Sequence, residues 1–329
     1  MGSMSLDLSS PSLRRVLPTA AAGVTVTLWA SAFVGIRFAG HAYSPGALTF
    51  ARQLTAAVVL TLVMLAVAAY RRRKPQLPRG ADLAKVIAWG VAWFGLYNLA
   101  LNAAGQRIDA GTMAVLVNLA PVLITVLAGF TLGERFSLRL VAGIAVAFTG
   151  VAVIAVTTST GHYDLAGVAL GLTAAMLYAS CATAQKPLLS RVSPLTMTWI
   201  GCLAGLVASL PFVGVFADEV VAASATATFT AVYLGAFPTA IAFLTWGYAL
   251  THMTAGRLST STYVVPPLVI AFSWLLLSEA PAPLAVLGGT LCLLGVAIAT
   301  TRRRGMGGRR PMAAPEEEAV AEPARILVR

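Results

Sequence analysis

An internal duplication is the feature of this sequence that most constrains its fold. Residues 118–154 and 263–298 share a pattern of a proline, a glutamate 13 residues later, and glycines 9 and 16 residues after the glutamate. The members are Pro121, Glu134, Gly143 and Gly150 in the first copy and Pro266, Glu279, Gly288 and Gly295 in the second. Such a repeat within apolar sequence indicates duplicated halves, which is the usual plan of membrane transporters.

The composition places the chain in a lipid bilayer. Of its 329 residues, 58% are hydrophobic and 11% are charged, and the mean hydropathy is +0.82. Ordinary soluble domains carry about 25% charged residues. The net charge of +11 comes from short basic clusters between apolar runs. This pattern orients helices in a membrane and offers no face for nucleic acid, so the bilayer is the expected partner.

No enzyme active site, metal site or cofactor is predicted. The three cysteines lie inside apolar runs without the spacing of metal ligands or disulfides. The histidines His41, His162 and His252 are dispersed over different loops. An integral-membrane enzyme needs convergent carboxylates, histidines or metal ligands. The sequence therefore predicts a protein without catalytic residues.

Ten apolar runs are long enough to cross the membrane as helices. A helix needs about 20 residues to cross the roughly 30 Å of hydrocarbon. The predicted spans are 17–38, 46–69, 84–105, 110–131, 138–157, 165–185, 194–215, 226–249, 256–277 and 283–301. We expect a cytoplasmic N-terminal segment (1–16), a first five-span repeat (17–157), a second (165–301) and a disordered cytoplasmic tail (302–329).

Lysine and arginine predict the orientation, because they are enriched in cytoplasmic loops. They cluster before span 1, in every second loop, and after span 10, whereas the opposite loops hold almost only Arg37 and Arg107. Both termini are therefore expected in the cytoplasm. Since each half has five spans, an odd number, the second half enters the membrane upside down. The predicted fold class is an all-α membrane protein with ten transmembrane helices in two inverted five-helix repeats.

The repeat also extends to the first two spans of each half, at an offset of 149 residues. Its matched residues are Trp29 and Tyr178, Arg37 and Lys186, and Pro45 and Pro194. With its Trp-Ala-Ser motif at 29–31 and the duplicated Pro-Glu-Gly-Gly block, the chain resembles the EamA-like ten-helix branch of the drug/metabolite transporter superfamily over residues 17–301. The resemblance implies a bacterial inner-membrane exporter of amino acids or related metabolites.

Polar and aromatic residues within the spans predict a substrate pocket. An amide in lipid must find a partner, so Asn98 and Asn118 are expected to point inward. Residues matched by the duplication lie symmetrically about an axis near the membrane midplane, where such transporters bind cargo. The predicted pocket consists of Trp29, Asn98, Asn118, Tyr178, Trp246 and Tyr263. Ring faces suit an apolar or ammonium group and amides suit a carboxylate. Interfacial aromatic belts and interhelical hydrogen bonds are the alternative interpretation of these residues.

Five further residues are candidates for a gating or structural role. Pro121 and Pro266 remove a backbone hydrogen bond within a span, which gives either a flexible joint or a static kink. Glu134 and Glu279 lie at span ends, where we expect them to cap the next helix or pair with a base. Arg52 lies six residues into span 2. It is expected to extend to the membrane surface or to tie down helix ends, although a charge within a span is also a candidate functional residue.

The function predicted from these features is a carrier that works by alternating access. The spans contain no cluster of Lys and Arg to neutralise phosphate, so a small uncharged or zwitterionic metabolite is the expected substrate. A passive channel and a flippase for a lipid-linked substrate are alternatives with the same fold. Oligomeric state stays open between a monomer and a homodimer, since one chain already contains both halves.

Overall fold

Helices form every secondary-structure element in the part of the chain that the computed structural model describes, which is residues 11–72, 77–124, 138–156, 164–253, 258, 261–279 and 283–300. The first half contains α1 (Pro11–Ala39), α2 (Pro45–Arg71), α3 (Gly80–Gly90), the π-helix η1 (Val91–Tyr97), α4 (Asn98–Gly105), α5 (Ala110–Val117) and α7 (Leu138–Val156). The second half contains α8 (Leu165–Leu189), α9 (Pro194–Ser209), the 3-10 helix η2 (Leu210–Phe212), α10 (Val213–Ala222), α11 (Ala225–Leu234), the π-helix η3 (Gly235–Ile241), α12 (Ala242–His252), the 3-10 helix η4 (Thr262–Val264), α14 (Val265–Leu277) and α15 (Pro283–Thr300).

Six helices in these described ranges are long and apolar enough to cross a membrane. They are Val16–Ala39, Pro45–Arg71, Gly80–Gly105, Leu165–Leu189, Pro194–Ala222 and Ala225–His252. Shorter apolar helices cover Ala110–Ile124, Val141–Val153, Thr262–Leu277 and Val286–Ile298. The expected all-helical membrane fold is confirmed. The helix predicted at 194–215 is longer than expected, because it continues through η2 and α10 to residue 222.

Local sequence signals set where several helices begin. Two of these signals, a serine cap and the proline after it, occur in both copies. Ser44 precedes Pro45 and its side chain accepts a hydrogen bond from the amide of Ala47, which caps α2. Ser193 precedes Pro194 and accepts from the amide of Thr196 in the same way. Serine at the cap satisfies a free amide, and proline at the first helical position loses no hydrogen bond. The Ser-Pro pairs therefore start equivalent helices in the two halves.

Both copies also contain a π-helical turn, at η1 and at η3. In each turn a side chain donates to the backbone carbonyl five residues earlier: Asn98 Nδ2 to Trp93 at 3.0 Å, and Thr239 Oγ1 to Leu234 at 2.8 Å. Pro238 lies inside η3 and cannot donate its own backbone hydrogen bond. Isolated π turns of this kind are frequent at functional sites.

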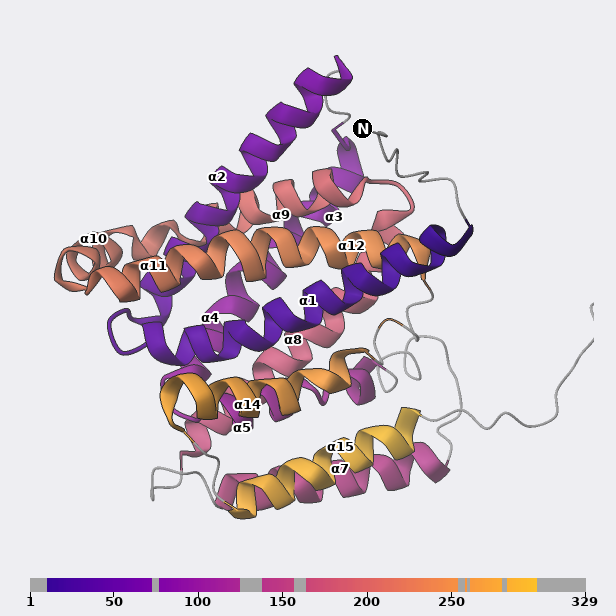
Figure 1. Ribbon diagram of the computed structural model, residues 1–329, viewed down its shortest axis with the longest axis vertical. Helices are drawn as coiled ribbons and strands as arrows, with labels where there is room; N and C mark the ends of the chain where they lie inside the picture. The colour runs from indigo at the N-terminus through magenta and orange to yellow at the C-terminus, as the bar shows by residue number, and fades with distance from the viewer. Residues whose placement is uncertain are drawn as a thin grey trace, which may run out of the picture.

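The last helices of the two copies, α7 and α15, pack along each other at one edge of the molecule (Figure 1). Gly150 of α7 lies against the backbone of Gly288, and Gly295 of α15 lies against the backbone of Gly143. These contacts are reciprocal, as expected for two equivalent elements related by a two-fold axis. Later residues of one helix meet earlier residues of the other, so the two helices run antiparallel. The four glycines of the sequence repeat therefore form one backbone-to-backbone interface.

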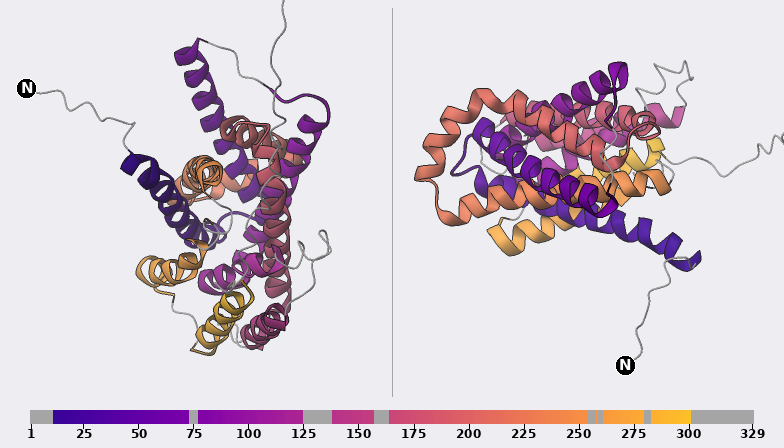
Figure 2. Two further views of the ribbon diagram at one scale, coloured as in Figure 1. Left: turned by 90° about the vertical axis from the view of Figure 1, so that its right-hand side faces the viewer. Right: turned by 90° about the horizontal axis from the view of Figure 1, so that it is seen from above.

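The remaining helices repeat this correspondence. In the first half α1 packs against α12 and α14, and in the second half its counterpart α8 packs against α4 and α5. Gly90, which directly precedes the π turn of the first copy, lies against the backbone of Gly201, and Gly235 of the second copy lies against the backbone of Arg52. α5 and α14 meet each other between the halves. The two further views show the same bundle along and across its helices (Figure 2).

We predict that Gly150→Ala and Gly295→Ala each destabilise the protein. An added methyl group overlaps the backbone of the facing helix at either position, and overpacking of this kind costs about 1–3 kcal/mol. The measurement is the midpoint of thermal unfolding in detergent. Gly23→Ala is the matched control, because Gly23 lies in α1 with nothing within 4 Å of an added Cβ. Equal midpoints for all three variants would contradict the close packing of α7 on α15.

Candidate functional site

An aromatic cluster surrounds Trp29 in the middle of the bundle. The centroid of its ring lies 4.9 Å from that of Trp246, 5.6 Å from that of Phe243 and 6.1 Å from that of Tyr178. Trp93 extends the cluster, with centroid distances of 5.1 Å to Phe243 and 5.5 Å to Tyr178. Tilted and edge-on contacts at these distances are favourable between aromatic rings. The cluster therefore joins α1, η1, α8 and α12 into one apolar wall.

A central cavity of about 30 Å³ adjoins this cluster. It is lined by Trp29, Phe33, Tyr97, Val117, Asn118, Ala120, Pro121, Tyr178, Thr262 and Val265. Three pairs among these residues are matched by the duplication, namely Trp29 with Tyr178, Val117 with Thr262, and Ala120 with Val265. The cavity therefore lies where equivalent parts of the two copies face each other. About 10–15 Å³ is enough for one water molecule, so a metabolite enters only if the surrounding helices move apart.

Both copies interrupt their helix beside this cavity. α5 ends at Val117, Asn118 and Leu119 form a turn, and helix resumes before Pro121. In the second copy the 3-10 helix η4 precedes Pro266. Asn118 Nδ2 donates to the carbonyl of Ala114 at 3.0 Å, while its buried Oδ1 has no partner. Asn118 is thus a lining residue at a break in the helix, and its amide oxygen is buried without a hydrogen-bond partner.

The structure brings together part of the predicted pocket. Trp29, Asn118 and Tyr178 line the cavity. Trp246 packs on Trp29 but is not in the lining, and its Nε1 donates to Gln185 Oε1 at 3.2 Å.

Two other members of the predicted pocket lie outside the lining. Asn98 bonds to the carbonyl of Trp93 in its own helix, and Tyr263 is half-buried beside the lining residue Thr262. Phe33 and Tyr97 also line the cavity and were not among the predicted pocket residues. Phe33 lies one helical turn after Trp29, so that spacing was an available signal.

Arg52 is buried and does not extend to a membrane surface as expected. Its exposed fraction is 4%. Its Nη1 donates to Asn102 Oδ1 at 3.0 Å and its Nη2 to Thr239 Oγ1 at 3.3 Å. Asn102 in turn donates to Thr49 Oγ1 at 2.9 Å. The acceptors come from α4 and η3, which cover this face of α2 and therefore hold the guanidinium inside the bundle.

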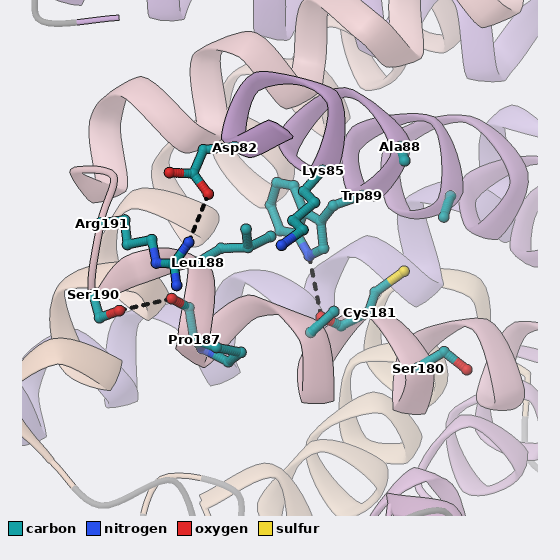
Figure 3. Close-up of a pocket in the computed structure, with 12 residues that line it drawn as sticks. Asp82, Lys85, Ala88, Trp89, Ser180, Cys181, Pro187, Leu188, Ser190 and Arg191 are labelled. Carbon is teal, nitrogen blue, oxygen red and sulfur yellow. Dashed lines mark hydrogen bonds and ion pairs between the residues drawn. The ribbon is translucent and has the colours of Figure 1, made fainter. Parts of the chain in front are cut away.

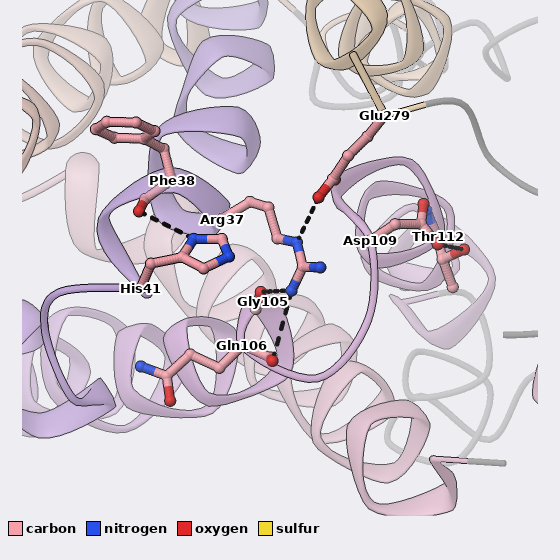
Figure 4. Close-up of polar contacts among 8 residues, drawn as sticks. All are labelled: Arg37, Phe38, His41, Gly105, Gln106, Asp109, Thr112 and Glu279. Carbon is pink, nitrogen blue, oxygen red and sulfur yellow. Dashed lines mark hydrogen bonds and ion pairs between the residues drawn. The ribbon is translucent and has the colours of Figure 1, made fainter. Parts of the chain in front are cut away.

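An ion pair joins α1 and the end of α14 at one end of the bundle (Figure 4). Arg37 Nε donates to Glu279 Oε1 at 3.0 Å, and Arg37 Nη1 donates to the carbonyl of Gly105 at 3.3 Å. The side chains are 17% and 29% exposed. Glu279 thus pairs with a base, one of the two roles expected for it. Glu134, its counterpart in the first copy, lies outside the described residues.

A larger cavity of about 540 Å³ lies between α3 and α8 (Figure 3). Trp89 forms one wall and donates from Nε1 to the carbonyl of Cys181 at 3.1 Å. Arg191 and Asp82 form an ion pair of 3.0 Å at its rim. Trp89 also lies 5.3 Å from Trp93, which contacts Tyr178. Aromatic rings therefore connect this α3–α8 cavity with the central cavity.

The α3–α8 cavity and the Arg37–Glu279 pair lie at opposite ends of α8. The first turn of α8 is capped by Asp164, which pairs at 3.2 Å with Arg107, two residues after Gly105. Its last turn lines the α3–α8 cavity. A helix of 25 residues is roughly 37 Å long. At one end of the bundle an ion pair thus joins α1 to α14, whereas the other end contains the α3–α8 cavity. In the described part of the chain no group of three potential metal ligands occurs.

Comparisons with known proteins agree with this architecture. The EamA-like transporter family matches residues 19–156 and 165–301. The "Probable terminal-alkyne amino-acid exporter" of Streptantibioticus cattleyicolor is 36% identical over 294 residues, covering 89% of this chain and 95% of the relative. The "Probable amino-acid metabolite efflux pump" of Escherichia coli is 26% identical, covering 84% and 92%. A solved crystal structure with 20% identity aligns with a TM-score of 0.57 over 86% of this chain and 97% of its own, which supports the fold.

Proposed function

The chain belongs to the EamA-like transporter family, and on this basis we propose that it exports an amino acid or a related zwitterionic metabolite by alternating access. The observation that carries the proposal is the central cavity lined by matched residues of both copies, with an ion pair towards one end of the bundle and an open cavity towards the other. A carrier needs such a site at the interface of its repeats and a means of closing each end in turn.

We propose that the halves are inverted, with ten spans, an inner-membrane location and both termini in the cytoplasm. The reciprocal glycine contacts of α7 and α15 support the inversion. Two equivalent antiparallel helices are exchanged by a two-fold axis perpendicular to them. For helices that cross a bilayer, such an axis lies in the membrane plane, which is the geometry of inverted repeats.

We predict that thiol reagents that cannot cross membranes distinguish the two sides. Cysteines replace Leu77, between α2 and α3, and Val221, near the end of α10, in a variant without native cysteines. Both side chains are exposed. In intact cells Val221→Cys should react and Leu77→Cys should react only after permeabilisation. Equal reaction of the two in intact cells would contradict the proposed orientation.

The proposed mechanism follows from the two ends of the bundle. In this conformation the Arg37–Glu279 pair links α1 to α14 on the outer side, and the α3–α8 cavity opens towards the cytoplasm. Cargo enters from the cytoplasm and reaches the central cavity as the helices separate. The interrupted helices at Asn118 and η4 are the joints at which spans 4 and 9 bend. The two halves then swap their conformations, which opens the outer end of the bundle.

The aromatic walls and the relatives support an amino acid as cargo. Trp29 and Tyr178 offer ring faces to an ammonium or an apolar group. Asn118 offers an unpaired amide oxygen, which accepts a hydrogen bond from an ammonium. The named activity of the S. cattleyicolor relative makes a terminal-alkyne amino acid the first compound to test.

We predict that proteoliposomes containing the purified protein exchange a labelled terminal-alkyne amino acid for the same unlabelled compound inside. A carrier gives exchange that saturates with the concentration of the compound and is accelerated by unlabelled compound on the opposite side of the membrane. A passive channel gives neither effect. The absence of saturable exchange with this compound and with a panel of ordinary amino acids would contradict the proposed function.

Trp29→Ala is the site variant in this assay. Removing the ring at the centre of the cluster should lower exchange about tenfold, because an aromatic pair contributes up to about 1.5 kcal/mol beyond the apolar area that it buries. Trp274→Ala is the matched control, since Trp274 is 65% exposed on α14. Equal exchange by both variants would show that the aromatic cluster does not bind the cargo.

We predict that Glu279→Gln makes the central cavity more accessible from outside. A reporter cysteine replaces the buried lining residue Ala120, and its rate of reaction with an impermeant thiol reagent is measured. Loss of a partly exposed ion pair worth about 1 kcal/mol should raise the rate about fivefold. Reversing the pair with Arg37→Glu and Glu279→Arg together should restore slow reaction. Arg107→Gln, which breaks an exposed pair at the same end, should change nothing. An unchanged rate in Glu279→Gln would contradict a gating role.

A further inference from the structure

Arg52 is a cation inside the helix bundle that has no acidic partner among the described residues. It donates to the amide oxygen of Asn102 and to the hydroxyl of Thr239, both of which are neutral. A buried charge within a membrane protein is costly unless it is paired, and such residues therefore mark functional positions. The neutral acceptors reduce this cost without cancelling the charge.

The unpaired groups around Arg52 point to a missing ligand. Arg52 Nε is buried without a hydrogen-bond partner. The next residue, Gln53, is fully buried, and neither its Nε2 nor its Oε1 has a partner. A buried polar group without a partner costs about 1–3 kcal/mol, and a charged one costs more. A buried guanidinium N–H without a partner is suited to an anionic group such as a carboxylate, and Gln53 Nε2 is a second unpartnered donor on the same helix.

The duplication shows that this charge belongs to one half only. The counterpart of Arg52 at the 149-residue offset is Gly201. The packing agrees with the match, because Gly235 of the second copy lies against Arg52 of the first, and Gly90 of the first copy lies against Gly201 of the second. A site built only from identical residues of the two copies presents the same chemistry to both ends of a cargo molecule. Arg52 removes that equivalence.

Tyr97 connects this polar cluster to the central cavity. It lines the cavity, and it lies five residues before Asn102, the acceptor of Arg52, in the same continuous helix Gly80–Gly105. Trp29 and Tyr178 line the same cavity. A zwitterion that reaches the cavity therefore meets ring faces from one set of residues and a cation beyond Tyr97. Ring faces and a cation together suit a molecule with an ammonium or apolar group at one end and a carboxylate at the other.

We propose that Arg52, with Gln53, binds the carboxylate of the cargo and so fixes its orientation in the cavity. This inference rests on the proposed function. When the helices separate, the carboxylate displaces Tyr97 from its position and accepts hydrogen bonds from Arg52 Nε and Gln53 Nε2. Asn102 and Thr239 hold the guanidinium in place before the cargo arrives. Chloride is also an anion that accepts hydrogen bonds, so it is the other ligand that this cluster suits.

The experiment compares a terminal-alkyne amino acid with its carboxamide as inhibitors of exchange in proteoliposomes. The carboxamide keeps the side chain and the ammonium and loses only the anionic group. For the wild-type protein the amino acid should inhibit about tenfold to a hundredfold better, as expected for charge-assisted hydrogen bonds. In Arg52→Gln this ratio should fall to about one, with carboxamide inhibition unchanged within about twofold. Arg71→Gln, an exposed position on the same helix, should keep the wild-type ratio.

Each other result overturns the proposal in a distinct way. Equal loss of inhibition by both compounds in Arg52→Gln, with a lower unfolding midpoint, would show that Arg52 only holds α2 against α4 and η3. A retained preference for the carboxylate, with inhibition by both compounds changing when gluconate replaces chloride, would assign the cluster to chloride. A wild-type ratio near one, with exchange intact, would remove the proposal and leave the proposed function standing. Failure of wild-type exchange would remove the function itself.

If Arg52→Gln does not fold, Arg52→Lys carries the test. Lysine keeps the charge but loses the planar set of donors, so the preference for the carboxylate should fall without disappearing. A ratio equal to that of the wild-type protein would show that the guanidinium does not contact the cargo.

Discussion

Backbone contact at glycines is the interaction on which the rest of this structure depends. Apolar helices in lipid gain little by burying apolar surface against one another, so their association relies on close van der Waals packing and interhelical hydrogen bonds. The contacts of Gly150 with Gly288 and of Gly295 with Gly143 join the two copies at one edge. Gly90 and Gly235 make the equivalent approaches deeper in the bundle. Each approach excludes even a methyl group, which fixes the relative position of the helices.

This arrangement places matched parts of the two copies around one small cavity. Trp29 faces Tyr178 there, and the interrupted helices at Asn118 and η4 meet beside it. Because close packing leaves only about 30 Å³, access depends on motion of whole helices and not on rotation of single side chains. The ion pair at one end of α8 and the cavity of about 540 Å³ at the other end show that the two ends differ in this conformation.

The departures from the repeat make the two copies chemically different near the centre of the bundle. Arg52 has glycine as its counterpart, and Trp29 has a tyrosine. Two equivalent halves give two equivalent routes into the cavity. A charge present in only one half, such as Arg52, would distinguish the two ends of a bound molecule. The π turns η1 and η3 adjoin these positions, since Thr239 of η3 both receives a hydrogen bond from Arg52 and donates one to Leu234. The polar cluster and the local backbone geometry therefore support each other.

The sequence by itself determined the helical membrane fold, the two copies and the residues at their matched positions. Apolar runs and glycine spacing are local or periodic properties, so they were sufficient to predict the helices. Polar and aromatic residues at or beside matched positions indicated a six-residue pocket, of which Trp29, Asn118 and Tyr178 line the cavity. Only the tertiary structure decided which polar groups meet. Arg37 and Glu279 are 242 residues apart, and Arg52 and Thr239 are 187 apart. No local pattern records contacts between such distant helices, and burial of Arg52 follows from the acceptors that α4 and η3 bring to it.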